Sequence, residues 1–67
     1  MISDTDIYRS ARVLVQTHDK DASIEAAMRA DEMLEKGELT GYAVWRRILK
    51  AVEELLRVEP AAGDRLH

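Results

Sequence analysis

Nitrogen and oxygen donors gather near the first polar break of the chain, at His18, Asp19, Asp21 and Glu25. Such groups can ligate a divalent metal ion. A calcium loop, however, alternates acidic ligands around a glycine, and a zinc-binding helix pairs two histidines four residues apart. Neither pattern is present. The segment is more typical of a histidine at a helix C-terminus followed by capping aspartates, and we expect no metal or other cofactor.

A second group of charged residues, Arg46, Arg47 and Lys50, forms a basic cluster in the third apolar segment. A short turn and another predicted helix precede it, as in a helix-turn-helix DNA reader. The chain has a net charge of −3, and Glu53 and Glu54 follow the cluster directly. This acidic balance argues against nucleic acid as a partner. DNA binding through Arg46, Arg47 and Lys50 therefore stays the alternative function.

Asp31 falls within an apolar arc of the second predicted helix, between Ile24 and Ala27 on a helical plot. A buried carboxylate without a partner is costly, so we expect Asp31 to be a buried or half-buried hydrogen-bond anchor that fixes the register of the helix. Its candidate hydrogen-bond partners from other helices are Tyr8, Trp45, Arg46 and Arg47.

Residue patterns of catalysis are missing from the sequence. There is no cysteine, which excludes thiol nucleophiles, and no serine, histidine and aspartate set or glycine-rich phosphate loop can be recognised. A core built from so short a chain also leaves little room for a substrate pocket. We therefore expect a protein that is not an enzyme.

The elements that position these residues are helices, because strong helix formers dominate and the three glycines and one proline punctuate the pattern. Apolar periodicity and capping residues predict helices over about 4–17, 22–36 and 41–58. Ser3, Asp21 and Thr40 are the predicted N-caps, and Gly37 is the predicted stop of the second helix.

Trp45 lies on the most apolar stripe, with Ile48, Val52 and Leu55, and we expect it to be the central packing residue of the core. Tyr8 flanks the stripe of the first helix as a further structural anchor. On the second helix the expected core arc comprises Ile24, Ala27, Met28, Ala30 and Leu34. Four apolar residues are left outside these stripes and form the expected interaction surface: Val13, Ala26, Met33 and Val58.

The connections between the predicted helices are short, which favours antiparallel neighbours. The expected architecture is an all-α three-helix bundle, up-down-up, in one domain of residues 1–59, followed by a flexible tail of residues 60–67. A 67-residue chain buries a small core, so self-association as a homodimer would add needed burial. The start of the chain has no basic segment followed by an apolar run, and no stretch is long enough to span a membrane, so a cytoplasmic location is expected.

Three segments resemble a family of short uncharacterised alphaproteobacterial helical proteins: Asp6 to Ala11, Ala26 to Asp31, and Gly41 to Ile48. The resemblance covers roughly residues 4–56. It implies a small bacterial protein that stands alone in the cytoplasm, and it carries no activity or site residues onto this chain.

Together these patterns predict a small acidic protein that acts as a protein-interaction or regulatory module. Its partner would be another protein or a second copy of the chain, with no membrane involved.

Overall fold

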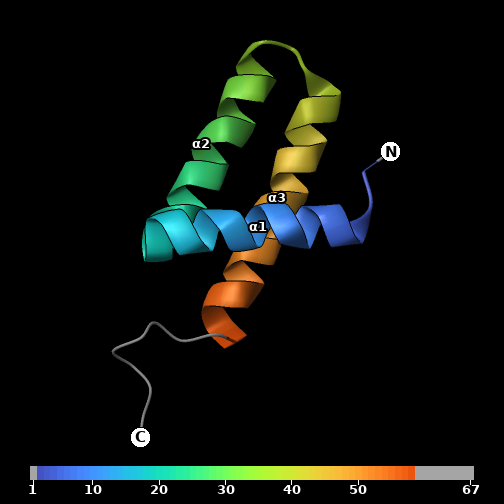
Figure 1. Cartoon of the computed structure of the whole chain (residues 1–67). Helices are drawn as coiled ribbons and strands as arrows, with labels where there is room; N and C mark the ends of the chain where they lie inside the picture. The colour runs from blue at the N-terminus through green and yellow to red at the C-terminus, as the bar shows by residue number, and fades with distance from the viewer. Residues whose placement is uncertain (1, 59–67) are drawn as a thin grey trace, which may run out of the picture.

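The computed structural model describes residues 2–58, and helices account for nearly all of them (Figure 1). Helical structure runs through residues 4–35, where a 3-10 turn, η1 (Asp19–Asp21), joins α1 (Asp4–His18) to α2 (Ala22–Glu35). The second stretch is α3 (Leu39–Val58). No strand occurs in residues 2–58, and the all-α prediction is confirmed. The predicted bundle of three separate helices is not confirmed, because η1 joins the first two into one helical stretch.

Local sequence signals explain two of the helix ends, the start of α1 and the end of α2. Ser3 caps α1, because its hydroxyl accepts a hydrogen bond from the backbone N–H of Asp6 at 3.2 Å. Asp21 makes no side-chain capping bond to α2, contrary to prediction, since η1 leads straight into that helix. α3 begins at Leu39, so Thr40 lies within its first turn and is not its cap.

Gly37 ends α2 as predicted, with φ of +74°. Two hydrogen bonds close the turn: the Gly37 N–H donates to the carbonyl of Leu34 at 3.0 Å, and the Glu38 N–H donates to that of Met33 at 2.8 Å. This is the Schellman arrangement, in which a residue with positive φ satisfies the last carbonyls of a helix. Glycine suits the position because it has no Cβ. The turn directs α3 back along α2.

α2 and α3 form an antiparallel hairpin, and α1 lies across it (Figure 1). The expected up-down order would place α1 alongside its neighbours, whereas here it crosses them. The crossing buries Ile7 and Ala11 of α1 against the hairpin. The expected domain of residues 1–59 exceeds the described part by its two end residues, and the predicted flexible tail, residues 60–67, lies outside it.

Small side chains dominate the core of residues 2–58, where five of the nine buried hydrophobic residues are alanines. The largest fully buried side chain is Val52. Alanines let helices approach closely but bury little apolar area, which limits the hydrophobic stabilisation. The buried residues are Ile7, Ala11, Ala22, Ala26, Ala30, Ile48, Ala51, Val52 and Leu55.

α2 is rotated relative to the prediction. Ala22, Ala26 and Ala30 face the core with exposures of 0, 0 and 2%, so the expectation that Ala26 lies on the surface is wrong. Ile24 and Met28, expected in the core, are 58% and 53% exposed. The alanine face of α2, and not the face with the larger side chains, packs on α3, because small side chains permit close contact between the two helices beneath the crossing α1.

Trp45 is half-buried and packs against the edge of the core, whereas Ile48, Val52 and Leu55 of the same stripe are buried. The guanidinium of Arg29 lies 6.0 Å from the centre of the Trp45 ring, within the range of a cation–π contact. Trp45 is therefore a peripheral packing residue. The centre of the core, which the sequence pattern assigned to Trp45, is occupied by Val52.

Candidate functional surfaces

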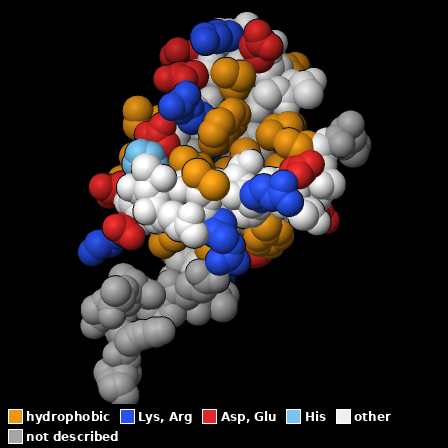
Figure 2. Space-filling model, in the orientation of Figure 1, with side chains coloured by type: hydrophobic (Ala, Val, Ile, Leu, Met, Phe, Trp, Pro, Cys, Tyr) orange, Lys and Arg blue, Asp and Glu red, His pale blue; other side chains and the backbone are white. Residues whose placement is uncertain are grey.

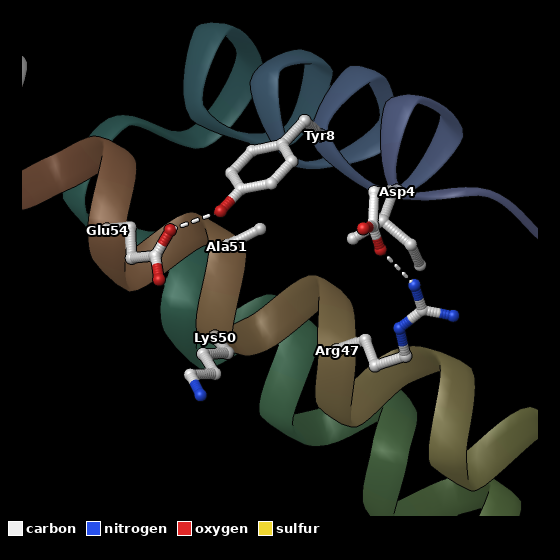
Figure 3. Close-up of a pocket in the computed structure, with 7 residues that line it drawn as sticks. Asp4, Tyr8, Arg47, Lys50, Ala51 and Glu54 are labelled. Carbon is white, nitrogen blue, oxygen red and sulfur yellow. Dashed lines mark hydrogen bonds and ion pairs between the residues drawn. The ribbon is translucent and has the colours of Figure 1, made fainter.

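A shallow groove between α1 and α3 brings several polar side chains together (Figure 3). The Tyr8 hydroxyl donates a hydrogen bond to the Glu54 carboxylate. At the other end of the groove, Nη2 of Arg47 lies 2.5 Å from Oδ1 of Asp4, and Nη1 donates to the Ile2 carbonyl at 3.3 Å. Each of these contacts connects α3 with α1 or the segment before it. The groove therefore contains a polar clamp that links α1 to α3.

Glu54 also makes Tyr8 harder to ionise. The hydrogen bond to Glu54 favours the neutral phenol, and desolvation and the nearby negative charges of Glu54 and Asp4 add to it, so the pKa of Tyr8 is raised. A phenol that is harder to ionise is a poorer base or nucleophile at neutral pH. The electrostatics suit a structural hydrogen bond better than chemistry.

Lys50 lies between the two clamp contacts, and Figure 3 shows its ammonium directed away from Glu54. Within residues 2–58 this ammonium forms no ion pair or hydrogen bond. Lys50 also borders a second shallow depression on α3, together with Arg46, Arg47 and Glu53. The predicted basic cluster is therefore contiguous, but Arg47 is occupied by Asp4, which reduces the positive charge that it presents.

The donors around the first turn do not form a metal site. Nowhere in residues 2–58 do three carboxylate, imidazole or thiol groups converge in a way that could hold a metal ion. Asp19 instead carries the backbone turn, with φ of +52° and ψ of −128°. These angles lie outside the left-handed helical well that aspartate tolerates, in a region that glycine adopts readily.

Asp31 is exposed, which corrects its interpretation as a buried or half-buried anchor. It forms no hydrogen bond with Tyr8, Trp45, Arg46 or Arg47. The rotation of α2 explains the difference, because it turns Asp31 and the large side chains of its arc away from the core, while Ala30 of the same arc stays buried. Asp31 therefore sits in solvent among apolar neighbours.

The predicted interaction surface is not brought together. Val13 is 54% exposed on α1, but Ala26 is buried and the side chain of Val58 lies outside the described part. Met33 is half-buried in the hairpin, on the α2 side facing Gly41 of α3. A Cβ placed on Gly41 would meet the Met33 sulfur at 2.7 Å. Gly41 thus allows the close approach of α3 to Met33.

Large apolar side chains are instead exposed along α2. Ile24, Met28 and Leu34 have exposures of 58, 53 and 49%, and they lie seven, three and three residues from Asp31, respectively. We call this surface, comprising Ile24, Ala27, Met28, Asp31, Leu34 and Glu35, the outward face of α2. Sequence reasoning grouped most of these residues correctly but turned them inward. The charge of Asp31 at the centre of the arc was the signal that the arc faces outward.

Hydrophobic side chains also remain visible over the part of the hairpin that α1 leaves uncovered (Figure 2). Arg29, which is exposed, lies over the Trp45 ring and is held by an ion pair to Glu25 at 2.9 Å. That hydrogen-bonded pair raises the pKa of Arg29 and keeps its charge beside Glu25 rather than on the outward face.

No helix within residues 2–58 has the length and apolar character needed to span a membrane. Comparisons with protein-family models, curated proteins and solved structures find no match to the chain.

Proposed function

We propose that this chain is a small helical protein-interaction module that acts without catalysis and binds its partner through the outward face of α2. The exposure of Ile24, Met28 and Leu34 beside a core made mostly of alanines carries the proposal. Exposed apolar residues that gather on one helix face are typical of interaction sites, whereas scattered ones are not.

Covering the exposed parts of these three side chains would stabilise a complex. Full burial of an isoleucine, leucine or methionine side chain is worth about 1.5–3 kcal/mol, so covering the exposed half of one contributes about 1 kcal/mol. Three such side chains in one row provide a compact apolar anchor. A partner helix can bury all of them at once, because at 3.6 residues per turn the three side chains fall within about 120° of the helix surface.

The test compares capture of partners by three forms of the immobilised full chain from a lysate of the source organism. Ile24→Ala combined with Met28→Ala should lose a partner that the unchanged chain retains. Val13→Ala removes an equally exposed apolar side chain from α1 and should retain it. If all three forms capture the same proteins, the outward face of α2 is not the binding surface.

We further propose that α1, α2 and α3 act as one cytoplasmic three-helix unit. The buried cluster supports a single unit of three helices, because it contains Ile7 and Ala11 of α1, Ala22 and Ala26 of α2, and Val52 of α3. The small size of these side chains also supports association with a second copy through a surface other than the outward face of α2, since a homodimer would bury more apolar area. Sedimentation equilibrium at two concentrations tests the dimer, and a monomer at high micromolar concentration would exclude it.

DNA binding through the basic residues of α3 is the second candidate. It is supported by the contiguous placement of Arg46, Arg47 and Lys50 along one depression. Phosphate contacts are strongest at low salt, so an electrophoretic mobility shift in a low-salt buffer is the appropriate assay. A shift that Arg46→Ala with Lys50→Ala abolishes would support this candidate. No shift by the unchanged chain would exclude it.

A further inference from the structure

The negative charge of the chain is concentrated on one helix. α2 contains four carboxylates, Glu25, Asp31, Glu32 and Glu35, and one cation, Arg29, giving it a net charge of −3. The whole chain also has a net charge of −3, so the nine acidic and nine basic residues outside α2 cancel. The helix that exposes the large apolar side chains therefore also carries the entire net charge.

The carboxylates are placed on or beside the apolar row. Asp31 lies three residues from both Met28 and Leu34, and Glu35 continues the same row one turn later. Glu32 flanks it, and all three acidic residues are exposed. Arg29 belongs to a different side of the helix, where it pairs with Glu25 and covers Trp45. The outward face of α2 thus combines apolar anchors with unneutralised negative charge and has no cation of its own.

We propose that the outward face of α2 docks a basic amphipathic helix of the partner protein, with lysine or arginine side chains opposite Asp31 and Glu35. This inference rests on the proposed interaction function and adds the chemistry of the partner. The row from Ile24 to Glu35 is about 17 Å long, which matches three turns of a partner helix. Apolar residues repeated at three and four positions supply the anchors in this mode of recognition.

Charge also distinguishes this partner from a second copy. Pairing α2 with α2 of another chain would bring two helices of net charge −3 together, and like charges in contact oppose association. A basic helix gains from the same charges and approaches faster because of them. The outward face of α2 is therefore complementary to a cationic partner and repels itself.

The experiment measures binding of a fluorescein-labelled peptide of 18 residues, made of leucine and lysine in a helical amphipathic order, by fluorescence anisotropy. The unchanged chain should bind it, and raising the salt from about 50 to about 300 mM should weaken binding about tenfold, because the attraction is screened. Two control peptides should bind at least about tenfold more weakly. One has glutamate in place of lysine, and the other has the same composition in a non-amphipathic order.

Three variants of the full chain assign the binding to the face. Ile24→Ala with Met28→Ala should weaken peptide binding about tenfold or more. Asp31→Asn with Glu35→Gln should also weaken binding about tenfold at low salt, and it should remove most of the dependence of binding on salt. Val13→Ala should bind within about twofold of the unchanged chain. Far-UV circular dichroism checks that each variant is helical.

Equal binding of the lysine and glutamate peptides, or normal binding by the charge-neutralised variant, would overturn the inference. If the peptide does not bind but a lysate partner is still captured through Ile24 and Met28, the interaction function stands and the basic partner is wrong. If neither binds, both proposals fail. A dimer that Ile24→Ala with Met28→Ala dissociates in sedimentation experiments would identify the second copy as the occupant, contrary to the inference.

Discussion

Replacing Ala26 by leucine tests the orientation of α2. Ala26 is fully buried within the core cluster, on the side of α2 that faces α1 and α3. Three additional carbon atoms cannot fit there unless the helices move apart. Overpacking of this kind costs about 1–3 kcal/mol. In a domain of this size each kcal/mol lowers the melting temperature by about 4–8 °C, so Ala26→Leu should lower it by about 5–20 °C.

Thermal and urea unfolding, followed by far-UV circular dichroism, measure this effect. The matched control is Ala43→Leu, the same substitution at an exposed position within α3. Alanine and leucine differ little in helix propensity, so the control should change the free energy of unfolding by less than about 0.5 kcal/mol. If Ala26→Leu is as well tolerated as Ala43→Leu, then Ala26 does not face the core and the described packing is wrong.

Three further predictions concern the turns and the clamp. Gly37→Ala should lower the free energy of unfolding by about 1 kcal/mol in urea titrations, because φ is +74° there and no neighbouring atom lies within 4 Å of an added Cβ; no loss would mean that the turn relaxes. Asp19→Gly should raise it by up to about 1 kcal/mol, since glycine relieves the positive φ, and a decrease would show that the aspartate side chain matters more than backbone strain. The pKa of Tyr8 is raised by Glu54, so the contribution of Tyr8 to stability should be complete below about pH 10 and decline as the pH rises through the raised pKa. Tyr8→Phe should remove this part of the alkaline decline in thermal unfolding, and an unchanged decline would contradict the assignment.

Local signals predicted the elements whose structure depends on near neighbours. Ser3 caps α1 through a hydrogen bond three residues away, and Gly37 ends α2 through its own backbone angle. The stripe of Ile48, Val52 and Leu55 is buried because α3 has only one apolar face. In each case the sequence offers one physical solution.

α2 offered two solutions, which is why its orientation was predicted wrongly. One side carries the alanines, with Ala26 at the centre, and the other carries Ile24, Met28 and Leu34. Hydrophobicity favours burying the larger side chains, but close contact between α2 and α3 under a crossing helix favours the small ones. Asp31 could have decided between them, because a charge at the centre of an apolar arc is costly inside a core.

The polar clamp could not be predicted from helical periodicity. Tyr8 and Glu54 are 46 residues apart, and Arg47 and Asp4 are 43 apart. Their pairing depends on the angle at which α1 crosses the hairpin, which η1 and the strained backbone of Asp19 set. Sequence reasoning proposed Tyr8 and Arg47 as partners of Asp31, whereas the crossing angle brings them to Glu54 and Asp4.

The most direct test of the account is the free energy of unfolding of the full chain carrying Ile24→Ala and Met28→Ala. Both side chains are more than half exposed, so the double variant should lose less than about 1 kcal/mol in urea titrations. Core residues of these types cost about 2–5 kcal/mol each when truncated to alanine. A loss of more than about 4 kcal/mol would place Ile24 and Met28 in the core and contradict the outward face of α2.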